Sequence, residues 1–136
     1  MLDARTVSVT IEARAEDVIR FVREPMNLAA WAKSFCQSVA YKNGEWYVET
    51  GEGAARVRFV EENPYGVVDF YLTLATGEEM VHPLRVMPNG ERCEVAATLF
   101  RRPEVSEEDF LLDGSMLIDD LRRLNQTMAQ IEGWLL

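Results

Sequence analysis

The segment from Ser106 to the C-terminus carries an apolar stripe at helical spacing, and no other feature of the chain constrains the fold as much. Acidic residues follow Ser106 and suit a helix N-terminus. The stripe recurs at alternating intervals of four and three residues, which places its members on one helix face. These members are Phe110, Gly114, Leu117, Leu121, Leu124, Met128, Ile131 and Leu135.

Most of the preceding chain has the alternation and turn residues of antiparallel strands. Residues 7–11 alternate apolar and polar and predict a first strand. Helical spacing over 15–22 stops before Pro25, and a second short helix is expected over 27–31. Six strands are predicted between Phe35 and the long helix. The expected fold class is therefore α+β, with a pocket between the curved antiparallel sheet and the buried face of the helix.

Four turns predict how the strands pair. Two-residue turns are expected at Asn43-Gly44 and Asn89-Gly90, a four-residue loop at 63–66, and a three-residue loop at 75–77 with Gly77 left-handed. In these registers the apolar side chains share the face toward the helix, and a slip of one residue would invert a strand. The predicted pairs include Tyr41 with Trp46, Phe59 with Phe70, Phe70 with His82, Val68 with Leu84, Val86 with Cys93, Arg85 with Glu94, and His82 with Ala97.

Length and charge limit the classes of function. A chain of 136 residues with 48% hydrophobic residues is expected to form a single domain over 1–136. Its net charge of -9 has the wrong sign for neutralising phosphates, so neither nucleic acid nor an anionic membrane surface is an expected partner.

The location and cofactor content are also predicted. No apolar run approaches the roughly 18 residues of a membrane span, and the first residues lack a signal-peptide pattern. Cys36 and Cys93 stand in no disulfide or zinc motif and are expected to be reduced and buried, which favours the cytoplasm. With a single histidine, His82, no metal site is predicted, and no cofactor motif occurs.

Three segments resemble the SRPBCC superfamily, and in particular its polyketide cyclase/dehydrase-like branch, which is related to the START and Bet v 1 proteins. They are PMNLAAW (25–31), PLRVMPNG (83–90) and TLFRRPEVSEEDF (98–110). The resemblance covers nearly the whole chain. It implies a helix-grip fold, in which the sheet wraps around the C-terminal helix and encloses a cavity for a hydrophobic ligand. The shared positions are turns and packing residues, so the resemblance does not choose a reaction.

The leading functional prediction is binding of a small hydrophobic or aromatic molecule in this cavity, with a volume of roughly 300 to 1,000 Å³. Gly114 is expected to leave room for the ligand on the helix side. The residues expected to contact the ligand are Trp31, Trp46, Phe59, Phe70, His82, Leu84, Ala97, Gly114, Leu117 and Leu121.

Two rival functions stay open. One is a cyclase or dehydratase acting on a polyketide-like substrate, with His82 as proton shuttle and Tyr41 holding a carbonyl oxygen. The alternative for His82 is a structural role, in which the imidazole at the half-polar edge of the pocket hydrogen-bonds to a neighbouring backbone group or to water. The other rival is a protein-interaction module similar to chaperone ATPase activators, which would use the outer sheet face. Arginines and scattered apolar residues on that face are also compatible with a homodimer contact.

Overall fold

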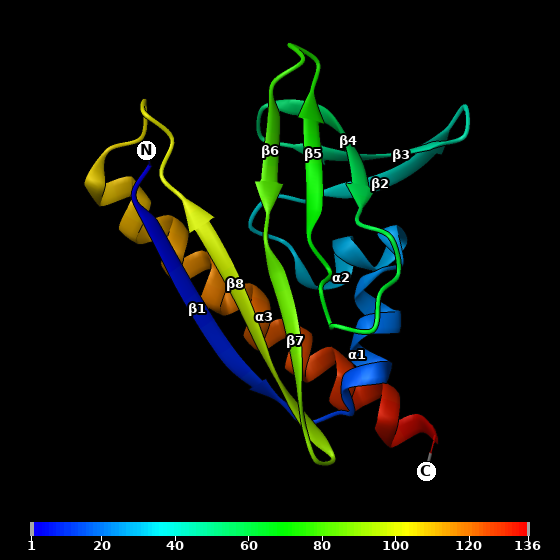
Figure 1. Cartoon of the computed structure of the whole chain (residues 1–136). Helices are drawn as coiled ribbons and strands as arrows, with labels where there is room; N and C mark the ends of the chain where they lie inside the picture. The colour runs from blue at the N-terminus through cyan, green and yellow to red at the C-terminus, as the bar shows by residue number, and fades with distance from the viewer. Residues whose placement is uncertain (1, 136) are drawn as a thin grey trace.

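The structure, a computed structural model, describes residues 2–135 and the side chains of residues 2–133. The predicted fold class is confirmed: a curved antiparallel sheet packs against the long C-terminal helix (Figure 1). The side chain of Leu135, the last member of the predicted stripe, lies outside the described residues. The elements are β1 (Ala4–Ile11), α1 (Ala15–Val22), the 3-10 helix η1 (Pro25–Asn27), α2 (Leu28–Trp31), β2 (Ser38–Lys42), β3 (Glu45–Thr50), β4 (Gly53–Phe59), β5 (Phe70–Leu74), β6 (Glu79–His82), β7 (Leu84–Asn89), β8 (Arg92–Phe100) and α3 (Glu107–Leu135).

The strands form two hydrogen-bonded groups, in the orders β1-β8-β7 and β2-β3-β4-β5-β6. Residues 66–68 connect the groups, because the Val68 N–H donates to the Leu84 carbonyl and the Val86 N–H to the Gly66 carbonyl, each over 2.8 Å. A Cβ at Gly66 would overlap the Val86 carbonyl oxygen, so only glycine lets the two backbones approach this closely. The two groups therefore behave as one curved sheet on the β7 side.

Seven strands, rather than six, lie between α2 and α3. The strand expected to run through Pro83 is divided there into β6 and β7. Proline has no N–H to donate to a strand ladder, and it favours a break or a bulge. As a result, β6 pairs with β5 while β7 pairs with β8, and the sheet parts between β6 and β8.

Most predicted registers are confirmed. Tyr41 lies opposite Trp46, and Phe70 lies between Phe59 on β4 and His82 on β6. The Asn43-Gly44 turn has positive φ at both residues, as a type I′ turn requires. Gly77 is left-handed, with a φ of 90°, at the end of the three-residue loop.

The predicted register between β7 and β8 is wrong by two residues. Arg85 lies opposite Ala96, not Glu94, and Val86 lies opposite Val95. Pro88 explains the shift. A turn at Asn89-Gly90 would place Pro88 in the closing pair of the hairpin, which needs its missing N–H. The observed turn lies one residue later, and its first central residue, Gly90, has a φ of 65°.

Helix α3 begins as predicted. The Ser106 hydroxyl accepts a hydrogen bond from the Asp109 N–H over 3.1 Å, which caps the helix N-terminus. In Figure 1 α3 runs obliquely behind β1, β8 and β7, and α1 and α2 lie beside its later turns. The buried residues of the stripe are Phe110, Gly114, Leu121, Leu124 and Met128.

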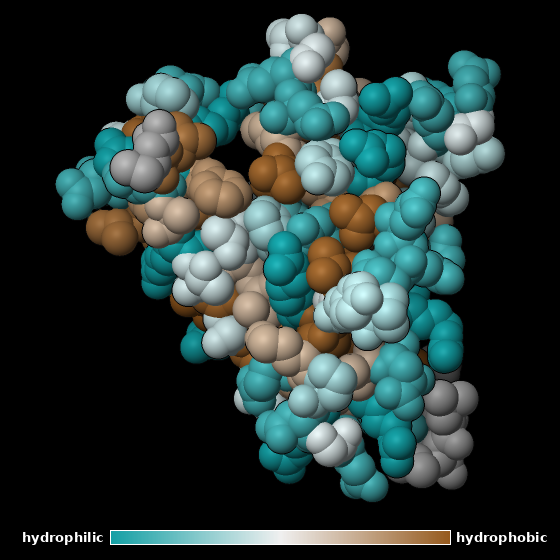
Figure 2. Space-filling view, viewed as in Figure 1, coloured by the Kyte–Doolittle hydropathy of each residue, from teal (hydrophilic) through white to brown (hydrophobic). Residues whose placement is uncertain are grey.

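Figure 2 shows one face of the molecule, on which hydrophilic side chains gather over the hairpin ends and hydrophobic ones are scattered between them. A groove of about 270 Å³ separates β6 from β8 on the sheet surface. Within the described residues, no helix is both long and apolar enough to cross a membrane.

Candidate ligand-binding cavity

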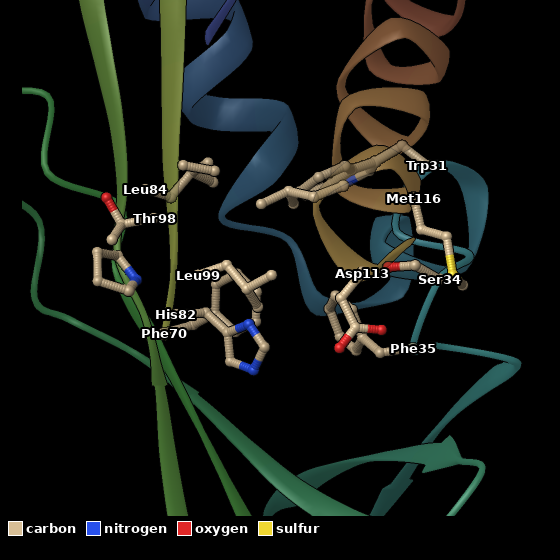
Figure 3. A pocket seen from close by; sticks show the side chains of 13 residues that line it. Trp31, Ser34, Phe35, Phe70, His82, Leu84, Thr98, Leu99, Asp113 and Met116 are labelled. Carbon is tan, nitrogen blue, oxygen red and sulfur yellow. The ribbon is translucent and has the colours of Figure 1, made fainter. Parts of the chain in front are cut away.

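A cavity of about 160 Å³ lies between α2, the first turns of α3, and strands β5 to β8 (Figure 3). Its walls are mainly apolar and aromatic. The cavity is smaller than the predicted range of volumes. Bulky side chains from α2 and the residues after it (28–35, called the α2 segment below) fill part of the space between helix and sheet. The lining residues are Trp31, Ser34, Phe35, Phe70, His82, Pro83, Leu84, Ala97, Thr98, Leu99, Asp113, Met116 and Leu117.

One wall is a cluster of three rings. His82 lies parallel to its cross-strand neighbour Phe70, with ring centroids 4.8 Å apart and an interplanar angle of 1°. Phe35, from the segment after α2, packs against both rings, with centroid distances of 5.2 Å to His82 and 5.7 Å to Phe70. The imidazole therefore has two aromatic neighbours that also contact each other, and Figure 3 shows the ring at the cavity wall.

This environment keeps His82 neutral. Burial lowers the pKa of His82 to about 4, because the charged imidazolium would lose its hydration among apolar rings. Its Nε2 atom is buried and makes no hydrogen bond to any described residue. At neutral pH the residue is thus an uncharged imidazole with an unused polar atom.

Trp31 supplies a second unused polar atom. The side chain is 2% exposed, and its indole Nε1–H is buried without an acceptor among the described residues. A buried donor left in this way costs about 1–3 kcal/mol. Two of the residues that line the cavity, Trp31 and His82, thus each have a side-chain nitrogen without a partner among the described residues.

A buried polar network holds the α2 segment against α3. The Asp120 carboxylate, which is 1% exposed, accepts hydrogen bonds from the Ser34 N–H and hydroxyl and from Arg123. The same Arg123 Nη1 donates to the Trp31 carbonyl over 3.0 Å. Burial raises the pKa of Asp120, although Ser34 and Arg123 act in the opposite direction. The network positions both Trp31 and Ser34 at the cavity.

Asp113 brings a carboxyl group to the rim. It projects from α3 and lines the cavity on the side opposite His82 (Figure 3). Partial burial, together with the Asp109 carboxylate one turn earlier, raises the pKa of Asp113. Asp113 is not among the residues that the sequence analysis predicts for the site. Its position four residues before Leu117 was the available signal.

The structure brings six of the predicted ligand-contact residues to the cavity. They come from α2, β5, β6, β7, β8 and α3, in agreement with the hairpin registers. The residues that the prediction did not include are Ser34, Phe35, Pro83, Thr98, Leu99, Asp113 and Met116. The six predicted residues are Trp31, Phe70, His82, Leu84, Ala97 and Leu117.

Four other predicted contacts lie elsewhere. Trp46 packs against Tyr41 on the β2–β3 hairpin, 4.9 Å between ring centroids, beyond the end of the cavity. Phe59 stands behind Phe70, 5.2 Å away, and so forms a second layer. Leu121 is fully buried in the core one turn further along α3 than Leu117.

Gly114 is the fourth, and the expectation that it leaves room for a ligand is wrong. The space beside it holds the side chain of Arg5 from β1, whose guanidinium a Cβ at Gly114 would overlap.

Tyr41, the predicted partner of His82 in catalysis, does not reach the site. Its side chain is 59% exposed and does not line the cavity.

Comparisons with known proteins bear on the fold. Family models and curated sequences each gave no match. Solved structures resemble the chain closely in shape. A START superfamily protein from Mycobacterium smegmatis shares 14% sequence identity, with a TM-score of 0.69, over 94% of this chain and 98% of that one.

Two further solved structures have the same shape. The di-domain ARO/CYC protein BexL, from the BE-7585A biosynthetic pathway, shares 17% identity with a TM-score of 0.69, over 94% of this chain and 47% of that one. Norcoclaurine synthase from Thalictrum flavum shares 12% identity with a TM-score of 0.67, over 94% of both chains. The chain therefore has the helix-grip fold of the SRPBCC superfamily, to which START and Bet v 1-like proteins belong.

Proposed function

We propose that the protein binds a small hydrophobic or aromatic molecule in the cavity between sheet and helix, through apolar contact and at least one hydrogen bond. The observation that carries the proposal is a mainly apolar and aromatic cavity in which two lining residues, Trp31 and His82, have side-chain nitrogens without a partner among the described residues. A ligand that accepts a hydrogen bond from Trp31 removes a penalty that the empty cavity carries.

The cavity volume limits the size of the ligand. An apolar cavity of about 150 Å³ takes a benzene ring, and this cavity measures about 160 Å³. A single aromatic ring with one or two small substituents fits that space. A fused polyketide of several rings does not fit without movement of the α2 segment.

Binding is favoured over proton-transfer catalysis. A general base works best when its pKa lies near the working pH, and burial lowers the pKa of His82 to about 4. The imidazole is therefore a weak base at neutral pH. Tyr41, the second residue of the catalytic hypothesis, lies outside the cavity.

The environment of the cysteines supports a reducing compartment. Cys36 and Cys93 are both free and buried, and burial raises the pKa of each thiol to about 11. Both thiols are thus protonated and unreactive. This supports the cytoplasm as the proposed location.

Isothermal titration calorimetry with 4-methylphenol and toluene tests the proposed function. The two probes share a ring and a methyl group, and only the phenol can accept a hydrogen bond from Trp31. We expect the phenol to bind about fivefold more tightly, the size of one net hydrogen bond. Trp31→Phe should abolish this preference while toluene still binds, and the control Trp46→Phe should keep it. Absence of binding by both probes would contradict the proposal.

A further inference from the structure

The rim of the cavity carries a carboxylate without a counterion. Asp113 lines the cavity, yet within the described residues its side chain makes no hydrogen bond and no ion pair within 4.0 Å. Partial burial and the neighbouring Asp109 carboxylate both raise the pKa of Asp113. Asp113 is exposed, so its negative charge lies at the mouth of the cavity, in contact with solvent and without a protein partner among the described residues.

The charges around Asp113 favour a positive ligand group. On α3 itself, Asp109 adds a second negative charge one turn earlier. Across the cavity, His82 is neutral at pH 7. Arg5 on β1 is a cation close by: its guanidinium lies over Gly114, the next residue of the helix, and it does not line the cavity. The protein as a whole carries a net charge of -9.

The interior of the cavity favours an apolar group of the ligand, in contrast to the charged rim. Leu84, Ala97 and Leu117 present only carbon atoms, and His82 and Phe70 present ring faces. Such walls favour a flat apolar group and give a charged one no compensation. A complementary ligand therefore has an aromatic ring at one end and a hydrogen-bond-donating cation at the other.

We propose that the ligand is a single-ring aromatic amine, with its ring in the cavity and its ammonium group bound by the Asp113 carboxylate at the rim. This inference rests on the proposed function, and it adds the substrate class. An ammonium donates charge-assisted hydrogen bonds, which are about twice as strong as neutral ones. Asp113 is exposed, and water weakens the ion pair, so the preference is expected to be about fivefold rather than a hundredfold.

Calorimetric titration with three probes that share one ring tests this inference at neutral pH. Benzylamine is a cation, benzyl alcohol is neutral, and benzoate is an anion. We expect benzylamine to bind about fivefold more tightly than benzyl alcohol, and benzoate to bind most weakly. Asp113→Asn keeps the shape of the side chain and should remove the preference for the amine. Toluene, which makes no hydrogen bond to residue 113, reports whether the cavity of this variant is intact. The control Asp109→Asn, on a residue that does not line the cavity, should keep most of the preference.

Each outcome decides a different point. Equal binding of benzylamine and benzyl alcohol to the wild type, or a preference that survives Asp113→Asn, overturns the inference and leaves the proposed function intact. Tighter binding of benzoate also overturns it, and would indicate that Arg5 dominates the rim. Absence of binding by all three probes overturns both the inference and the proposed function. Binding of toluene to the Asn variant shows that the cavity is intact.

Discussion

His82 illustrates how surroundings decide the chemistry of a residue. The residue type suggests a proton shuttle, since an unperturbed histidine titrates near neutral pH. Packing against Phe70 and Phe35 removes water from the ring and makes the charged form unfavourable. The neutral ring can still donate or accept a hydrogen bond, and this suits it to recognition of a ligand.

The pH dependence of stability reports this burial. Burial lowers the pKa of His82 from 6.5 to about 4 in the folded protein. Between these values the unfolded chain binds more protons, so the stabilising contribution is fully present above about pH 6.5 and is lost as the pH falls toward 4. The shift corresponds to about 3 kcal/mol at most.

His82→Phe removes the titrating group and keeps an aromatic ring in the stack. We predict that urea unfolding shows a steeper loss of stability for the wild type than for this variant as the pH is lowered through that window. The comparison cancels the carboxylates, which titrate in both proteins. Parallel curves for the two proteins would mean that His82 titrates as an exposed histidine does.

At the residue scale the sequence predicts a position well when burial alone decides its role. Trp31, Phe70 and Leu84 reach the cavity as predicted, because alternation and turn chemistry specify their face. Gly114 shows the limit. Its place on the buried stripe was clear, but the neighbour that fills the space, Arg5, comes from a strand more than a hundred residues earlier. No local pattern encodes that contact.

At the scale of elements, the short helix α2 depends on its contacts with α3. Four residues are too few to form a stable helix alone. The Asp120 carboxylate provides the main polar contact, because it binds Ser34 directly and also orients Arg123 toward the Trp31 carbonyl. The cavity wall that carries Trp31 is therefore tied to one carboxylate on the long helix.

Asp120→Ala should loosen this wall. The substitution leaves the Ser34 N–H and Arg123 without their acceptor, and we expect a loss of about 3 kcal/mol in the free energy of unfolding. The neighbouring pair Asp119 and Arg122 is exposed and 3.9 Å apart, so Asp119→Ala should cost less than about 0.5 kcal/mol. Chemical denaturation measures both values.

A second readout separates positioning from stability alone. If Asp120 holds Trp31 in place, Asp120→Ala should also weaken binding of 4-methylphenol more than binding of toluene, under conditions where the variant is folded. Equal stability of the two alanine variants, or an unchanged ratio of the two affinities, would show that the network does not position the tryptophan.

Strand pairing was predictable where the turn residues act alone. Asn43-Gly44 and the loop ending in Gly77 have the conformations that their residues favour. The β7–β8 hairpin was misread because a proline next to the turn outweighed the Asn-Gly preference. The division of one strand at Pro83 has the same cause, the missing N–H.

At the scale of the whole molecule, one arginine bridges the parts of the sheet that separate at β6 and β8. Arg102 follows β8 and contacts Glu52 in the β3–β4 turn and Glu78 in the β5–β6 turn, at 3.2 and 3.1 Å. The groove between these strands shares His82, Thr98 and Leu99 with the inner cavity. The Arg102 contacts thus link β8 to the β3–β4 and β5–β6 turns near the groove that adjoins the cavity.

Arg102→Gln should increase opening at this place. We predict that backbone amides of Glu79–His82 exchange with deuterium about fivefold faster in the variant, because surface ion pairs contribute up to about 1 kcal/mol. The control Arg56→Gln breaks an ion pair with Glu45 inside the five-stranded group and should leave β6 unchanged. Hydrogen exchange followed by NMR distinguishes the two. An equal effect of both variants would contradict a bridging role.

The volume of the cavity could not be predicted at any scale. It depends on how Trp31 and Phe35 fill the gap between helix and sheet, and this packing follows from the tertiary structure and not from a pattern in the sequence. The cavity lies where it was predicted and has mainly apolar walls as expected, but its volume is smaller than predicted. That size restricts the proposed ligand to one ring.

The most direct test of ligand binding in the cavity is an NMR titration of the wild-type protein with 4-methylphenol, observed at the tryptophan indole N–H resonances. We predict that the Trp31 signal shifts with saturation, because its Nε1–H gains an acceptor from the ligand. The Trp46 signal should stay in place, since that side chain lies outside the cavity. A titration in which the Trp31 signal does not move, or in which only the Trp46 signal moves, would contradict ligand binding at this site.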